Sequence, residues 1–409
     1  MDRMEKPLFD VGGVMLHQPF KIRRLGHIGL NVTDLAKCLA FYRDLMGFRV
    51  SDPLDFGKFH PKAEELKKVG DPRMIFTSHN TDHHSLVLLD RKVAEAMAGD
   101  DAVPDDVTVN QLTWQVGSLL EVSKATDWFN ELHVHYNRAG RDMPGSNWMV
   151  YPDDPEGHRN ELYYGMEQVG WIGRPKPRAM YDRGFRVRPE LPQIPEYEEV
   201  KQALAKKIDL LSGYHEEERL PAKYEVDGIL MPRPFKVVRH GPVRVFVRDM
   251  EKMAAHYQDV MGFTVTEETS FNGHRCIFLR CNTEHHSLAL YPIALRKDLG
   301  LRDDTTILSI GMQMATWRQL HAAIAFLKEH GCRVIELPAG LTPGIDHRVY
   351  VDDQGGHLVE LYFQMEQVGW DGKPRPAGMR RPQVFKDWPE TISPESDTYR
   401  GEPFLGPWA

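Results

Sequence analysis

Two short stretches of the chain each carry a pair of adjacent histidines at the start of an apolar run. "NTDHHSLVLLD" runs from Asn80 to Asp90, and "NTEHHSLALYP" runs from Asn282 to Pro292. Imidazole titrates near neutral pH, so a histidine can take a proton from a reacting group and later return it. The duplication therefore indicates either a fold inherited twice or one chemical site present in two versions.

A glutamate is repeated in the same way. "ELYYGMEQVGW" starts at Glu161 and "ELYFQMEQVGW" starts at Glu360, and the residues that follow predict a buried strand in both places. An unpaired buried carboxylate is costly, so each glutamate needs a metal ion, an arginine or an exposed position. His27 opens another strand-like run, "HIGLNVTD", where a lone histidine is more often structural than a metal ligand.

The repeat extends far beyond these residues. "DLAKCLAFYRDLMGFRV" (34–50) matches "DMEKMAAHYQDVMGFTV" (249–265) at an offset of 215, whereas the histidine pairs are offset by 202. The first half therefore has about thirteen extra residues between Phe48 and His83. They lie in the polar stretch 51–74, whose glycines and prolines predict a loop or lid that is the main difference between the halves.

Each half is itself divided into two similar units. The strand-like run "GHIGLNVTD" is followed by a helical stretch, with Asp34 as its N-cap and Gly47 at its end, and by the strand-like runs "RMIFTSH" and "HHSLVLL". The same order recurs in "NQLTWQV", "LLEVSKATDWFNELHV", "NWMVYPDD" and "RNELYYG". The pattern predicts four strand–helix–strands units, which form two domains.

The composition is that of an ordinary soluble globular protein, with a net charge of −8 over 409 residues. This acidity argues against a nucleic-acid binder, which would concentrate basic residues. No stretch approaches ~20 apolar residues, so no membrane span is expected, and "MDRMEKPLFDVGG" lacks the apolar core of a secretory signal. A reducing cytoplasm is the expected compartment, because no metal cluster or disulfide framework can be built from the four cysteines, Cys38, Cys276, Cys281 and Cys332.

The order of these motifs resembles the vicinal-oxygen-chelate superfamily (glyoxalase, bleomycin resistance and extradiol dioxygenase), and within it the type I extradiol ring-cleaving dioxygenases. The resemblance implies an α+β fold of two domains, each made of two βαβββ modules that form a cup-shaped mixed sheet around a metal. It assigns roughly 20–172 to a first domain with the active site, 173–235 to a linker with a helix, 236–370 to a second domain with a degenerate site, and 371–409 to a C-terminal tail.

The resemblance also implies roles for five residues of the first half. His27 and Glu161 match two of the family's three metal ligands, and Gln111 stands where the family has its second histidine ligand. His84 matches the acid/base residue. Tyr151, ten residues before Glu161, matches the tyrosine that contacts the substrate.

The second half departs further from the family's pattern. Pro242 and Ser309 stand at the positions of its two histidine ligands, while His286, Tyr350 and Glu360 remain. A proline offers no ligand atom and a serine offers only a weak one. A metal ion is therefore expected in the first half alone.

The chemistry that the resemblance implies depends on Gln111. Two histidines and a carboxylate suit Fe(II) because they leave open positions for two reactants. A glutamine offers a neutral carboxamide oxygen instead, as glyoxalase I of the same superfamily does with a glutamine ligand. Fe(II) is therefore the first expectation for the cofactor, and Mn(II) or another divalent metal is the alternative.

The function implied is that of an extradiol-type dioxygenase, an oxidoreductase of aromatic compound degradation that cleaves a catechol or hydroquinone-like diol with O₂. Two alternatives stay open: a glyoxalase-like isomerase or lyase, which Gln111 motivates, and a non-catalytic small-molecule-binding protein, which the degenerate second half motivates. The expected partners are a small aromatic substrate and O₂, with no nucleic acid or membrane. Members of the superfamily often dimerise, so a homo-oligomer is also open.

Alternatives remain for single residues as well. His84 and His286 could simply cap a strand in both halves. His83, one residue from His84 on an expected strand, should point to the opposite face. His158 and His357 lie in the turns "DPEGH" and "DDQGGH", where they are interpreted as loop residues.

Overall fold

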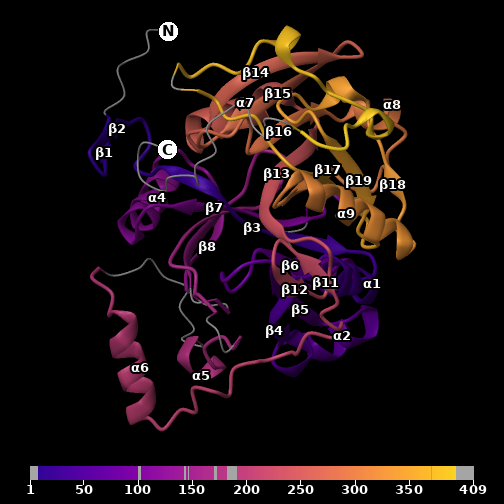
Figure 1. The fold of residues 1–409 in the computed structure, drawn as a ribbon. Helices are drawn as coiled ribbons and strands as arrows, with labels where there is room; N and C mark the ends of the chain where they lie inside the picture. The colour runs from indigo at the N-terminus through magenta and orange to yellow at the C-terminus, as the bar shows by residue number, and fades with distance from the viewer. Residues whose placement is uncertain are drawn as a thin grey trace.

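The first half of the chain folds as two βαβββ modules that share one sheet (Figure 1). The structure is a computed structural model that describes residues 8–99, 103–141, 144–145, 147–169, 173–181, 191–369 and 371–392. The first module comprises β3 (Ile22–Val32), α1 (Leu35–Ala40), β4 (Arg49–Asp55), β5 (Arg73–Ser78) and β6 (Leu86–Asp90). The second comprises β7 (Val109–Val116), α4 (Leu119–Glu131), β8 (Tyr136–Gly140), β9 (Trp148–Pro152) and β10 (Asn160–Tyr164).

The second half repeats this arrangement. Its first module comprises β13 (Val237–Val247), α7 (Met250–Ala255), β14 (Thr264–Phe271), β15 (His274–Arg280) and β16 (Leu288–Pro292). Its second comprises β17 (Ile307–Met314), α9 (Trp317–Glu329), β18 (Val334–Ile335), β19 (Arg348–Asp352) and β20 (Leu358–Tyr362). In Figure 1 this half, salmon to yellow, lies at the upper right of the first.

Both sheets have eight strands in the same mixed order. The first runs β4-β5-β6-β3-β7-β10-β9-β8 and the second runs β14-β15-β16-β13-β17-β20-β19-β18. In each, the opening strands of the two modules pair antiparallel at the centre, and each of them also pairs in parallel with the last strand of its own module. The predicted α+β fold of two domains, each with two βαβββ modules, is confirmed.

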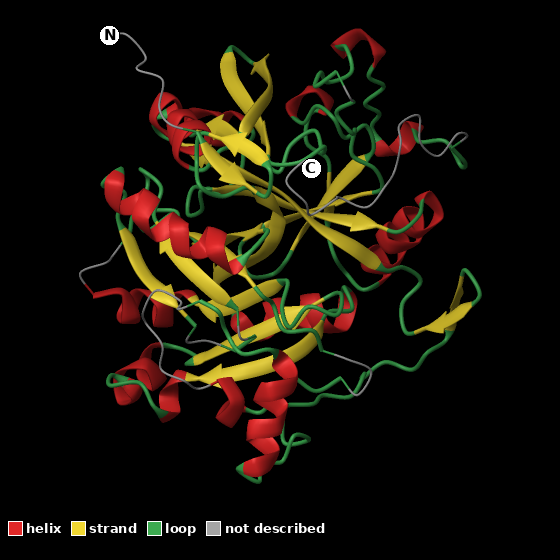
Figure 2. Cartoon of the chain, turned by 90° about the vertical axis from the view of Figure 1, so that its left-hand side faces the viewer, coloured by secondary structure: helices red, strands yellow, loops and turns green. Residues whose placement is uncertain are grey.

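The helices begin where the sequence predicted. The Asp34 carboxylate accepts a hydrogen bond from the Lys37 backbone N–H at the start of α1, and Asp249 does the same for Lys252 at the start of α7. Further helical segments surround the sheets (Figure 2), namely η1 (Phe41–Leu45), η2 (Phe56–Lys58), α2 (Ala63–Val69), α3 (Arg91–Ala98), η4 (His256–Val260), α8 (Ala294–Asp298), η5 (Ala339–Leu341), η6 (Ala377–Met379) and η7 (Phe385–Asp387).

The stretch 51–74 is not the loop that its composition predicted. It continues β4 to Asp55 and then forms helix α2. Leu54, Phe56 and Leu66 from this stretch are buried in a separate apolar cluster on the sheet. These few apolar residues are enough to fold the insertion, because the polar residues between them form the exposed side of the helix.

A two-stranded hairpin precedes each half. β1 (Phe9–Val11) pairs with β2 (Val14–Leu16), and β11 (Tyr224–Val226) pairs with β12 (Ile229–Met231). Both lie outside the expected domain limits at residues 20 and 236. The remaining linker contains α5 (Arg178–Tyr181) and α6 (Glu196–Ala205), and the expected ends at residues 172 and 370 fall outside the described residues.

The turns "DPEGH" and "DDQGGH" join the two halves. His158 is fully buried, and its Nε2 lies 2.9 Å from the Thr306 hydroxyl of the other half. His357 makes the matching contact, with its Nε2 2.9 Å from the Thr108 hydroxyl. Both histidines are in turns, as expected, but they are interface residues and not exposed loop residues, since each turn packs against the opposite domain.

Two lysines extend the same reciprocal pattern. The Lys21 ammonium donates to the Cys281 carbonyl at 2.6 Å, and the Lys236 ammonium donates to the His79 carbonyl at 2.6 Å. Each of these contacts therefore occurs twice, with the roles of the halves exchanged.

Among the described residues, no helix combines the length and the apolar character needed to cross a bilayer.

Candidate active site

His27 and Glu161 meet at the centre of the first sheet. His27 lies on β3 and Glu161 on β10, and each pairs with Thr113 of β7, the strand between them. The Nε2 of His27 is 3.1 Å from Oε2 of Glu161, and the two side chains are 1% and 0% exposed. We call the face of the sheet that carries these residues the first cup.

The backbone beside His27 is adapted to this arrangement. The register between β3 and β7 shifts between Leu25 and His27, which is an irregularity that can re-aim a side chain. A Cβ atom at Gly26 would lie 2.2 Å from the Tyr163 hydroxyl, so only glycine fits there. The Tyr163 ring in turn packs 5.3 Å from the ring of His27, measured between their centres.

The Glu161 carboxylate is held by neutral donors as well as by His27. The Thr113 hydroxyl donates to Oε2 at 3.1 Å, and the Asn147 amide donates to Oε1 at 2.8 Å. Thr113 and Asn147 were not predicted. The only sequence signal for Thr113 is its place two residues after Gln111 on the same strand, and Asn147 lies in a polar loop that shows no pattern.

Gln111 lies on the same face, but among the described residues no hydrogen bond joins it to His27 or Glu161. It pairs with Gly29 across β3 and β7, and its Oε1 is 2.7 Å from the position that a Cβ of Gly29 would occupy. Its carboxamide therefore lies over Gly29. Within the described part of the chain, no hydrogen bond is made by this amide, so its role as a third ligand stays a prediction.

The ring of His84 lies beside that of His27 at the first cup, and its catalytic role stays a prediction. Its ring centre is 4.2 Å from that of His27, and burial, together with the neighbouring His27 and His83, lowers the pKa of His84 well below its usual value. The prediction that His83 points away from His84 is wrong, because the two Nδ1 atoms lie 3.0 Å apart. The alternation rule fails here because β6 begins only at Leu86, so neither histidine lies on a strand.

Tyr151 lies on β9 beside the cup. It packs against Met149 and Tyr163, and the Arg138 guanidinium carbon is 4.4 Å from the centre of its ring. In the second half the matching tyrosine, Tyr350, donates directly to Glu360 at 3.0 Å. Asn147 fills that role in the first cup, so Tyr151 stays a predicted substrate contact.

Two donors of the first cup are spaced as two ligands of one divalent metal ion would be, although the described residues contain no group of three or more histidines, cysteines and carboxylates that could hold an ion. Two ligands bound about 2.0–2.2 Å from one ion and at right angles to each other are about 3 Å apart. The His27–Glu161 distance of 3.1 Å matches this separation. An imidazole, a carboxylate and the nearby Gln111 carboxamide are also a chemically suitable donor set.

The two cups should respond alike to the loss of a neutral donor. Asn147→Ala removes the amide that binds Oε1 of buried Glu161, and Tyr350→Phe removes the hydroxyl that binds Oε1 of buried Glu360. An unsatisfied buried acceptor costs about 1–3 kcal/mol, so each variant should lose that much unfolding free energy in urea titrations. An Asn147→Ala protein as stable as the wild type would contradict this role for Asn147.

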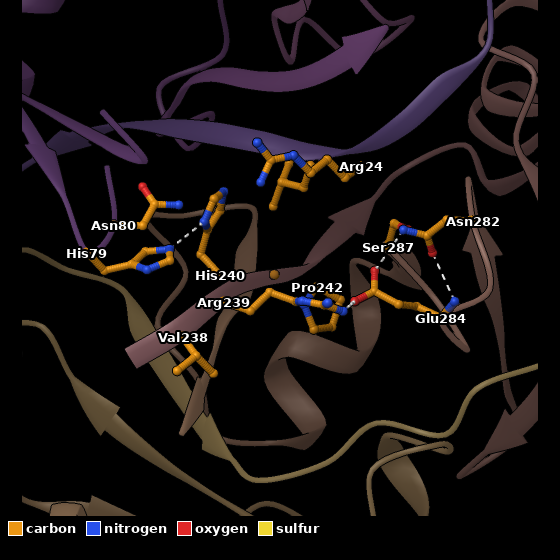
Figure 3. Close-up of a pocket in the computed structure, with 12 residues that line it drawn as sticks. Arg24, His79, Asn80, Val238, Arg239, His240, Pro242, Asn282, Glu284 and Ser287 are labelled. Carbon is orange, nitrogen blue, oxygen red and sulfur yellow. Dashed lines mark hydrogen bonds and ion pairs between the residues drawn. The ribbon is translucent and has the colours of Figure 1, made fainter. Parts of the chain in front are cut away.

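A cavity of about 260 Å³ lies elsewhere, between the two halves. Figure 3 shows that His79 and His240 face each other at one side of it, with 3.0 Å between His79 Nε2 and His240 Nδ1. Arg24 and Arg239 also line it. None of the predicted site residues of the first cup lines this cavity.

A comparison of the sequence with known proteins finds similarity to a metapyrocatechase over part of the chain. The chain is 27% identical to metapyrocatechase from Pseudomonas sp. (strain CF600) over 133 residues. The match covers 32% of this chain and 40% of that relative, so it spans less than half of the relative's length.

Solved structures resemble the fold over most of the chain. The 2,3-dioxygenase LapB from Pseudomonas sp. KL28 has a TM-score of 0.55 at 15% identity, with 87% of this chain and 96% of that chain covered. The Mn(II)-bound glyoxalase from Novosphingobium aromaticivorans has a TM-score of 0.53 at 15% identity, with 86% and 85% covered. At such identities these likenesses establish the fold alone.

The two halves also match one sequence family. Its description is Glyoxalase/Bleomycin resistance protein/Dioxygenase superfamily, and the matched residues are 24–162 and 239–361. These ranges span nearly all of both sheets and make up more than half of the chain. The chain therefore belongs to the Glyoxalase/Bleomycin resistance protein/Dioxygenase superfamily.

Proposed function

We propose that the first cup is the active site of a metal-dependent extradiol-type dioxygenase that cleaves a catechol or hydroquinone-like aromatic diol with O₂. The observation that carries the proposal is the buried His27–Glu161 pair, 3.1 Å apart, with the His84 ring packed against His27. Imidazole and carboxylate donors beside a second imidazole provide for metal binding and for proton transfer at one place. The similarity to a metapyrocatechase supports this assignment.

His27, Glu161 and Gln111 would hold the metal. Fe(II) is the first choice, and Mn(II) or another divalent ion is the alternative because Gln111 offers an oxygen in place of a nitrogen. Such an ion, when bound, would make the hydroxyl groups of a chelating diol more acidic and would offer a position for O₂.

The chain's own residues have separate tasks in this proposal. His84 takes a proton from a hydroxyl of the diol and later returns it to an oxygen of the product. Tyr151 orients the aromatic ring through its hydroxyl. Asn147 and Thr113 hold the Glu161 carboxylate in one orientation, because they bind different oxygens of it.

Two other functions each have one observation in their favour. The Gln111 carboxamide favours a glyoxalase-like isomerase or lyase, because glyoxalase I also uses a glutamine as a metal ligand. Such chemistry needs no O₂. The existing hydrogen bonds of Glu161 favour a non-catalytic binding protein, because His27, Thr113 and Asn147 already satisfy the carboxylate.

One experiment separates the three functions. The protein is purified without oxygen, its metal content is measured, and O₂ uptake is then followed with catechols and hydroquinones. A dioxygenase should contain about one ion per chain and consume about one O₂ per diol cleaved. Bound metal without O₂ uptake would favour an isomerase or lyase, and binding of the diols by a metal-free protein would favour a binding protein.

A further inference from the structure

An arginine in the second half stands where the first half has a glycine. Gly29 of β3 pairs with Gln111 of β7, and Arg244 of β13 pairs with Ser309 of β17. We call the face of the second sheet that carries Arg244, Ser309 and Glu360 the second cup. The two cups therefore also differ at the position of Gly29, which adds no side chain to the first.

The Arg244 guanidinium fills the second cup. Its Nη1 contacts the Glu360 carboxylate and lies 3.3 Å from the Ser309 hydroxyl, and its Nη2 lies 3.0 Å from His286 Nε2. Arg244, Ser309, Glu360 and His286 are all fully buried. A guanidinium can only donate, so His286 accepts this hydrogen bond with its Nε2.

These partners are the counterparts of the site residues in the first cup. Glu360 corresponds to Glu161, and His286 corresponds to His84. Ser309 likewise corresponds to Gln111 by strand register. The Arg244 guanidinium thus lies among the same three positions that surround the proposed metal site of the first cup, while a second arginine, Arg348, lies farther from the carboxylate, with its Nε 3.8 Å from Oε1 of Glu360.

We propose that the Arg244 guanidinium is a built-in cation that replaces a metal ion in the second cup, and that the residue at this position, Gly29 or Arg244, decides whether a cup binds metal. The part that concerns Gly29 rests on the proposed function. The part that concerns Arg244 does not.

Arg244 would keep a metal ion out of the second cup by its positive charge and by the space that its side chain occupies. Arginine stays protonated in proteins, so its positive charge compensates buried Glu360 permanently. A divalent ion placed in the second cup would lie beside that charge in a medium of low dielectric constant, where like charges repel strongly. Restoring ligand atoms at Pro242 and Ser309 would therefore not be enough to create a metal site.

The decisive experiment compares two variants that differ only in Arg244. The first is Pro242→His/Ser309→Gln/Arg244→Gly, which gives the second cup the donor set of the first. The second, Pro242→His/Ser309→Gln, keeps the arginine. After incubation with Mn²⁺ and desalting, the triple variant should hold about one more ion per chain than the wild type, and the double variant should hold no more than the wild type. Extra metal in the double variant, or none in a folded triple variant, would overturn the proposal.

The single variant Arg244→Gly gives a second readout if the triple variant does not fold. It removes the cation that contacts buried Glu360 and leaves only the more distant Arg348, so the melting temperature should fall by on the order of 10 °C in EDTA. Added Mn²⁺ should raise the melting temperature of Arg244→Gly part of the way back. In a protein that keeps Arg244, Mn²⁺ should not stabilise the second cup. A variant that melts at the wild-type temperature in EDTA would overturn the proposal.

The reciprocal exchange tests the first cup. Gly29→Arg/Gln111→Ser copies the second cup's pair into the first, and the new guanidinium should bind Glu161. We expect a folded protein, by circular dichroism, that has lost the metal of the wild type. Retention of that metal would overturn the role of Gly29. A wild-type protein that binds no metal would instead count against the proposed function, and the melting temperature of Arg244→Gly in EDTA would still test whether Arg244 is the cation that balances Glu360.

Discussion

Replacing His84 by alanine should lower turnover by about 10²–10⁴-fold while the metal content stays near that of the wild type. His84 packs against the ring of His27 but is not one of the proposed ligands. Its loss therefore removes the group that moves the proton and leaves the metal donors in place. Steady-state O₂ uptake with a catechol, together with metal analysis of the same preparation, measures both quantities.

The matched control is His286→Ala in the second cup. It should leave the turnover of the folded protein unchanged, because no substrate chemistry is proposed there. It should lower stability, since Arg244 Nη2 loses the acceptor that lies 3.0 Å away. If the two variants lose turnover equally, or if His84→Ala loses its metal, then the proposed difference between the cups is mistaken.

Glu161→Gln and Glu360→Gln should damage different properties of the protein. Glu161→Gln weakens the metal site, so we expect metal content to fall sharply and turnover to fall by roughly 10³-fold or more. Glu360→Gln leaves the Arg244 guanidinium buried without a counter-charge. Removing one partner of a buried ion pair typically costs about 3–5 kcal/mol, so this variant should lose that much unfolding free energy.

Urea titrations and metal analysis of Glu161→Gln and Glu360→Gln test this expectation. Metal content should change in Glu161→Gln alone, and the larger loss of stability in metal-free buffer should occur in Glu360→Gln. Equal metal loss in the two variants would mean that the second cup also binds an ion. Equal stability loss in metal-free buffer would mean that Glu161 has a cationic partner of its own.

The features that could be predicted from the sequence are those that local patterns determine. Asp34 marks the start of α1 because a capping interaction spans only three residues. The order of strands and helices follows from alternating and helical spacing of apolar residues in the same way. The approach of His27 to Glu161 was also predicted, but from the resemblance and not from the spacing of these residues.

The features that could not be predicted depend on contacts between distant residues. Arg244 is 116 residues away from Glu360, and nothing local to Arg244 shows that its side chain turns into the second cup. Asn147 replaces a tyrosine as the donor to the site glutamate only because the backbone brings it there. His83 was misplaced because a rule for strands was applied to a loop.

The reciprocal contacts between the halves have a consequence for how such a chain can arise. Lys21 binds the carbonyl of Cys281 as Lys236 binds that of His79, and His158 binds Thr306 as His357 binds Thr108. Contacts that occur twice with exchanged roles are the kind that two identical subunits form about a two-fold axis. The chain thus has the internal geometry of a homodimer whose subunits were joined by residues 173–235. Joining them made their association intramolecular, so the residues of one half could change and that half could still keep its place in the assembly.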